Sequence, residues 1–183
     1  MAKALTCLIW LAATTGALAL AEMPDPGRDL YLTAGGYGCA VCHGPVANGS
    51  GQAGGPIRGA TREAFEKALV EQPAMQLLVS VLSPGNIADL SRYLGSLAQI
   101  PLLELVYADS GWRVTQEAVT SGQTVQLVVV NDSFIDLSLS LPDFGFASIT
   151  IAPLDTQVFE WVAVAGSFLL PDNGLFVVSV KDL

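Results

Sequence analysis

The chain has 183 residues, 51% of them apolar, and its 8 basic and 17 acidic residues give a formal net charge of −9. This length suggests one or two domains, each with enough residues for a hydrophobic core. The acidic balance argues against a nucleic-acid or anionic-membrane partner, because both need a basic protein surface.

The first 21 residues have the pattern of a secretory signal peptide. Lys3 is the only charged residue before Glu22, an apolar run continues to Leu20, and the run ends in the small-residue processing site 19–21. An uncleaved anchor is the alternative, although the run is shorter than the ~20 residues of a spanning helix. We therefore predict a periplasmic chain from residue 22 onward, with 7 basic and 17 acidic residues and no membrane span.

Three helices are predicted before a composition change near Ile100-Pro101. Proline near a helix start and a following glycine pair predict a helix over 26–32. Thr61 is a good N-cap for a helix over 61–70. Ser83-Pro84 followed by leucines and isoleucine at helical spacing predicts the third, over 84–97.

The motif Cys39-Ala40-Val41-Cys42-His43 carries the chemistry of this half. In an oxidising compartment two cysteines can form a disulfide, and a C-x-x-C pair can be a redox dithiol. The adjoining His43 instead favours attachment of haem c. Two thiols three positions apart can reach the two vinyl groups of one porphyrin, with the imidazole as iron ligand.

Most of residues 26–98 resembles the class I cytochrome c family. The resemblance implies that the Pro56 backbone carbonyl accepts a hydrogen bond from His43, which would fix the imidazole tautomer. It also implies that the first and last helices cross, with Tyr31 or Tyr93 near the haem edge. The matching stretches are 27–31, 38–44, 55–59 and 90–94.

The sixth iron ligand is argued partly by elimination. His43 is the only histidine, so two histidine ligands cannot come from this chain. Of the methionines, Met23 would lie at the new N-terminus, whereas Met75 lies where the family places its ligand. Gln76 departs from the proline common at the next position, and Met75 as core filler remains the alternative. Met/His ligation favours electron transfer over chemistry at an open iron.

Residues 49–54 also match the dinucleotide pattern G-x-G-x-x-G. That pattern requires a preceding strand and a following helix, and here it follows a haem motif and runs into Gly55-Pro56. We predict instead that these glycines let a loop lie close to the haem plane.

Residues 101–183 are rich in alternating apolar and polar residues, which predicts short strands over 124–130, 135–141, 147–151, 156–162 and 175–180. They loosely resemble the cupredoxin family in 122–131, 141–142, 152–156 and 166–168. A blue-copper site needs two His and a Cys, and this half has neither residue, so no copper is expected. Trp112 and Trp161 are expected to pack in its core, with an interface role as the alternative.

The predicted fold class is therefore an all-α cytochrome c domain over 22–100 followed by an all-β, metal-free sandwich over 101–183. The predicted function is periplasmic electron transfer rather than catalysis, through one haem c held by Cys39, Cys42, His43 and Met75. Residues 101–183 hold 10 acidic and 2 basic residues, so they are expected either to dock a basic redox partner or to aid solubility. A fixed subunit of a larger oxidoreductase and a gas-binding haem sensor or enzyme are the alternatives.

Overall fold

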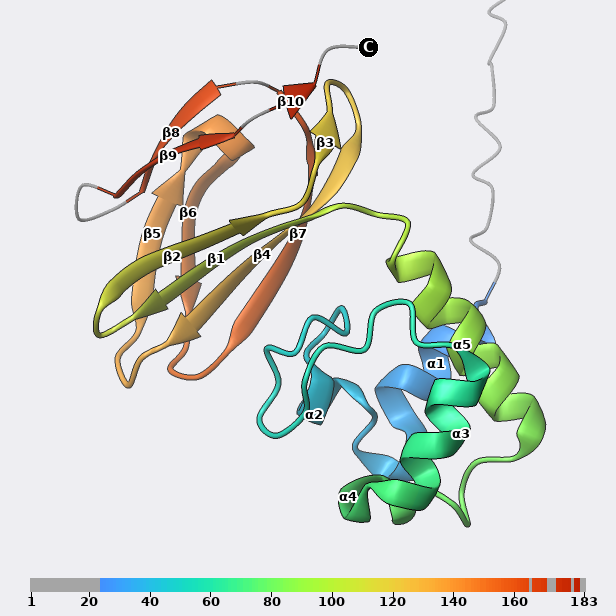
Figure 1. Ribbon diagram of the computed structural model, residues 1–183. Helices are drawn as coiled ribbons and strands as arrows, with labels where there is room; N and C mark the ends of the chain where they lie inside the picture. Colours follow the sequence, from blue (N-terminus) through green and yellow to red (C-terminus); the bar gives the residue numbers. More distant parts are fainter. Residues whose placement is uncertain (1–23, 165, 171–173, 179, 182–183) are drawn as a thin grey trace, which may run out of the picture.

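The computed structural model describes residues 24–164, 166–170, 174–178 and 180–181 (Figure 1). The predicted signal peptide lies outside the described residues. Within the described part, every α-helix lies before Ile100 and every strand after Pro101. We call residues 24–100 the helical segment and residues 101–181 the strand segment.

The three predicted helices are confirmed to within a residue or two. Two further helices of a single turn, one at the cysteine motif and one at Met75, were not predicted. The elements are α1 (Pro26–Thr33), the 3-10 turn η1 (Ala34–Gly36), α2 (Ala40–His43), α3 (Arg62–Glu71), α4 (Pro73–Gln76) and α5 (Pro84–Leu97).

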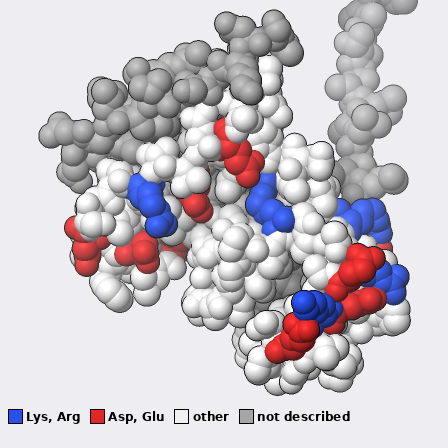
Figure 2. Space-filling model, viewed as in Figure 1, with Lys and Arg blue, Asp and Glu red and all other residues white. Residues whose placement is uncertain are grey.

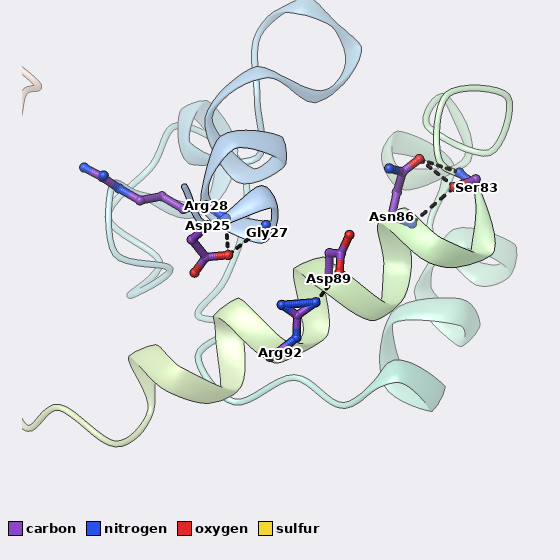
Figure 3. A network of polar contacts seen from close by, with 7 residues as sticks. All are labelled: Asp25, Gly27, Arg28, Ser83, Asn86, Asp89 and Arg92. Atoms are coloured by element: carbon purple, nitrogen blue, oxygen red, sulfur yellow. Dashed lines mark hydrogen bonds and ion pairs between the residues drawn. The ribbon is translucent and has the colours of Figure 1, made fainter. Parts of the chain in front are cut away.

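The starts of α1 and α5 are fixed by side-chain caps (Figure 3). The carboxylate of Asp25 accepts a hydrogen bond from the backbone amide of Gly27 at 2.9 Å. At α5, the hydroxyl of Ser83 accepts from the backbone amide of Asn86, and the Asn86 side chain accepts from the Ser83 amide. These bonds satisfy amides that have no partner inside the helix, so local sequence alone sets both starts.

Helices α1 and α5 cross in close contact, as expected. A side chain at Gly27 would overlap the backbone carbonyl of Asp89 on α5, so only glycine permits this approach. Beside the crossing, the rings of Tyr31 and Tyr93 lie 5.5 Å apart between centroids. Tyr31 is completely buried, with Leu90 of α5, at the centre of the helical core.

The largest sheet has four strands in the order β2-β1-β4-β7, with β1 parallel to β4 and the other neighbours antiparallel. The remaining strands form three two-stranded sheets, β5-β6, β8-β9 and β3-β10. The bounds are β1 (Leu102–Ala108), β2 (Gly111–Gln116), β3 (Val119–Thr120), β4 (Thr124–Asp132), β5 (Leu137–Leu141), β6 (Phe146–Ile151), β7 (Thr156–Val162), β8 (Gly166–Leu170), β9 (Gly174–Val178) and β10 (Val180–Lys181), with the 3-10 turn η2 (Pro142–Phe144).

All five predicted strands are found, but β1 and β2, which make half of the largest sheet, were not predicted. The core of this segment is tightly closed: Leu105, Leu127 and Ile151 have no exposed surface. Trp161 is also buried, with its ring 4.9 Å from that of Phe144, in keeping with a packing role.

The expected fold class is wrong. The chain is a mixed α/β fold with about 32% helix and about 30% strand, in one four-stranded sheet and several two-stranded sheets. No helix occurs between 44 and 61, and α2 and α4 have only four residues each, so the helical segment is not an all-α cytochrome domain. Periodicity predicts elements one at a time, whereas fold class depends on which elements pair and on how much chain stays irregular.

The two segments are joined by side chains as well as by the chain itself. The guanidinium of Arg58 donates to the side-chain carbonyl of Gln126 on β4 at 2.7 Å and to the backbone carbonyl of Ile100 at 2.5 Å. It also donates to the backbone carbonyls of Val46 and Leu97. The Arg58 side chain therefore connects the loop at Val46 and the C-terminal end of α5 to β4 of the strand segment.

Candidate haem-attachment site

The two cysteines of the motif lie on one turn of helix. Cys39 is the N-cap of α2, and its carbonyl accepts the backbone amides of Cys42 at 3.2 Å and His43 at 2.9 Å. Side chains three positions apart share a face of a helical turn, so both thiols can face one planar group. Neither thiol is in a disulfide. Gly44 ends the turn with φ of +83°, a conformation that side chains disfavour.

The His43 ring is held from one side by the loop. Its Nδ1 lies 2.8 Å from the backbone carbonyl oxygen of Gly55. Because a carbonyl only accepts, Nδ1 carries the proton and Nε2 keeps its lone pair for a metal. A carbonyl partner of this kind also orients a ligating imidazole.

The residue that supplies this carbonyl was predicted to be Pro56, and that prediction is wrong by one position. The backbone amides of Ile57 and Arg58 both donate to the carbonyl of Ala47, at 2.9 and 3.2 Å. These bonds hold the chain after Pro56 against Ala47, on the other side of the loop. With the chain held there, the Gly55 carbonyl points toward the His43 ring. Sequence resemblance located the dipeptide but could not say which of its two carbonyls points inward.

The glycines of the loop lie against the motif itself. A side chain at Gly54 would overlap the His43 ring, and one at Gly51 would overlap the backbone of Cys42. The Gly54 amide donates to the Cys42 carbonyl at 2.7 Å. Neither a strand nor a helix of the kind that a dinucleotide site needs flanks this loop. The glycine spacing was thus a usable signal for the residues that contact the imidazole, although these glycines were expected to face the haem plane.

Tyr31 anchors the far end of the motif. Its hydroxyl donates to the Gly44 carbonyl at 2.6 Å, and burial raises the pKa of this phenol. Burial, with a smaller contribution from Cys42, also raises the pKa of the Cys39 thiol to about 11. A redox dithiol needs a lowered thiol pKa, so this environment does not suit the thioredoxin-like alternative.

Met75 lies in α4, and its side chain is partly buried. It packs against the same apolar cluster that contains Cys39, Tyr31 and Leu90. The structure thus brings Cys39, Cys42, His43 and the Gly55 carbonyl together around α2, and it places Met75 against the apolar cluster that contains Cys39.

Large apolar side chains outside this cluster are exposed in the helical segment. The side chains of Tyr37 and Leu77 are 82% and 79% exposed, although they flank the motif and α4 in sequence. A porphyrin is a large apolar plate, and it would cover such surface. Other large apolar side chains exposed in the helical segment are those of Leu32, Val41, Val70, Val79 and Val81. Two free thiols, an oriented imidazole and uncovered apolar surface fit a covalently bound haem.

The described residues also bear on other kinds of site. They contain no group of three or more His, Cys, Asp or Glu side chains arranged to hold a metal ion. A haem iron does not need such a group, because the porphyrin supplies four ligands. Among the same residues, no helix is long and apolar enough to cross a membrane.

Comparison with known proteins adds no relative. No family model matches the chain, and neither the curated proteins nor the solved structures include a match.

Proposed function

We propose that the protein is a periplasmic electron carrier with one haem c bound to Cys39 and Cys42 and ligated by His43 and Met75. The observation that carries the proposal is the His43 geometry: an imidazole directly after two unbridged thiols, oriented through Nδ1 by the Gly55 carbonyl. The resemblance of the motif-bearing stretches to class I cytochromes c supports it. When bound, the haem supplies an iron centre that gains and loses one electron.

The residues of the chain hold this centre in place. Cys39 and Cys42 would hold the porphyrin covalently, and the hydrogen bond from Tyr31 to the Gly44 carbonyl holds the end of α2. Gly51 and Gly54 let the loop close behind the imidazole, so the ring has little freedom to rotate. A rigid ligand frame keeps reorganisation small when the iron changes charge, which suits electron transfer.

Met75 is the proposed second axial ligand. It is the only methionine among the residues that the structure describes, and its side chain packs against the apolar cluster that contains Cys39. A thioether on the iron raises the reduction potential and leaves no open position for gas binding or catalysis. The strand segment is proposed to dock the redox partner.

The test is an absorption spectrum of the protein matured in a periplasm with its haem-attachment machinery. The oxidised protein should show the weak far-red band of methionine sulfur on ferric iron, and Met75→Ala should abolish it. Met23→Ala is the matched control, because Met23 is the other methionine that remains after the predicted leader. This control should keep the band.

Two results would contradict the proposal. If the matured protein contains no covalent haem, the proposal that this chain binds haem c is wrong. A c-type haem that lacks the band and binds carbon monoxide when reduced would remove Met75 and favour an open iron position, as in a sensor or an enzyme.

A further inference from the structure

Large apolar side chains are exposed to solvent at one end of the largest sheet. Phe134 and Ile135, between β4 and β5, are 79% and 65% exposed, and Leu154, between β6 and β7, is 57% exposed. Figure 1 shows both turns at the lower end of the strands. The two turns are neighbours because Val130 pairs with Thr156, and Leu137 with Ile151. We call these three residues the apolar tip.

A buried polar network holds the apolar tip in shape. The completely buried Asn131 donates through Nδ2 to the backbone carbonyls of Ile135 at 2.7 Å and Ala152 at 3.0 Å. Its Oδ1 accepts from the Ser133 hydroxyl at 2.6 Å. One side chain therefore links both turns. Their apolar side chains are presented on a fixed backbone, which lowers the entropy lost on binding.

The rim of the apolar tip is acidic. Asp132 at the end of β4 and Asp136 and Asp155 in the two turns are all exposed, and residues 132–136 and 152–155 contain no lysine or arginine. Arg113 on β2 is a basic side chain that lines the same cleft as Asp132. In Figure 2, acidic side chains lie on the left of the drawn face, over the strand segment, with a basic one beside them.

The same end of the sheet lies next to the loop that holds His43. A cleft of about 240 Å³ has Asn48, Gly49, Ser50 and Gly51 on one wall and β1, β2 and β4 residues, including Asp132, on the other. Asn48 crosses between the walls and donates to the Glu104 carboxylate at 2.6 Å. A protein seated on the apolar tip would therefore lie beside the segment that carries the proposed haem.

We infer that the apolar tip is the docking surface for a redox protein whose own apolar contact patch is rimmed by lysine or arginine. Charge complementarity selects this occupant. A second copy of the chain would bring the same carboxylates together, and an anionic membrane would be repelled in the same way. The inference deepens the proposed function, on which it rests for the redox role of the partner.

The test uses the full matured protein and, as probe, a lysine-rich mitochondrial-type cytochrome c. Backbone amide shifts should change on titration in the turns 132–136 and 152–155. The variant with Phe134→Ser, Ile135→Ser and Leu154→Ser should bind the probe about tenfold more weakly at unchanged net charge, as expected when central apolar contacts are removed. The variant with Asp132→Asn, Asp136→Asn and Asp155→Asn should flatten the salt dependence of the association rate.

The matched controls lie outside the surface. Val162→Ser with Val164→Ser removes exposed apolar side chains at the opposite end of β4, where Val162 pairs with Thr124. Glu117→Gln, Asp143→Asn and Glu160→Gln remove the same charge elsewhere in the strand segment. Both controls should bind the probe like the parent protein, and thermal unfolding should show that every variant is folded.

An equal loss of salt dependence in the association rate of the charge variant and of its control would overturn the inference. Net charge rather than this surface would then steer the probe. Absence of shifts in the two turns would overturn the inference as well. Failure of the proposed function is distinguishable, since a protein without covalent haem can still be titrated by its amide shifts.

Discussion

The helical segment and the strand segment both have a closed core, but they differ in the side chains that could hold a cofactor. In the strand segment, side chains from β1, β4 and β6 have no exposed surface, and the cluster includes two tryptophan–aromatic contacts. In the helical segment, Tyr31, Leu90 and Leu94 are equally buried, and each segment leaves large apolar side chains exposed, such as Tyr37 and Phe134. The helical segment carries all of the Cys, His and Met residues described.

The difference indicates which segment would hold the proposed haem. The described residues of the strand segment include no His, Cys or Met, whereas the helical segment has two thiols and an oriented imidazole. The predictions below test this contrast, because they should affect the two segments unequally.

The largest effect is expected from Cys39→Ser combined with Cys42→Ser. The variant should contain no covalent haem on a denaturing gel stained for haem. Hydrogen exchange should quicken in peptides of α1, α3 and α5 and stay slow in β1 and β4, because only the helical core would pack against the proposed haem. Covalent haem in the variant, or equal loosening of both segments, would contradict the contrast.

The second effect concerns the core of the strand segment. Leu127→Ala removes a completely buried side chain of β4 and should lower the free energy of unfolding by about 2–5 kcal/mol. The haem absorption spectrum should not change, because the strand core contains no ligand. Val162→Ala, at an exposed position of β7, is the control and should change stability by about 0.5 kcal/mol or less. An altered spectrum in Leu127→Ala would show that the two cores are not separate.

The third effect concerns the connection between the segments. Arg58→Met deprives the backbone carbonyls of Leu97 and Ile100 and the side chain of Gln126 of their donor, and should cost about 1–3 kcal/mol. Calorimetry should then separate one unfolding transition into two.

The control for Arg58 is Arg62→Met. Arg62 forms a largely exposed ion pair with Glu66, which is worth about 0–1 kcal/mol. Two transitions already present in the parent protein would mean that Arg58 does not couple the segments.

The smallest effect is expected at the start of α5. Ser83→Ala removes the hydroxyl that caps the Asn86 amide and should cost about 1 kcal/mol in chemical denaturation. Ser96→Ala, at an exposed position near the end of the same helix, is the control and should cost less than about 0.5 kcal/mol. Equal costs at the two serines would show that the cap does not limit the stability of the helix.

By itself, the sequence determined the local features of this protein. The caps at Asp25 and Ser83, the alternation in β5 and the C-x-x-C-H motif each depend on residues a few positions apart, so spacing reveals them. The absence of His and Cys after residue 100 likewise needed no structure to exclude a blue-copper site.

Only the tertiary structure decided how these pieces combine. It showed that β1 lies between β2 and β4, that the chain is a mixed α/β fold rather than an all-α domain followed by a sandwich, and that Gly55 rather than Pro56 faces His43. It also brought Phe134 and Leu154, 20 positions apart, to one end of the sheet. Each depends on contacts between residues distant in the chain, and local spacing carries no information about which distant partner is chosen.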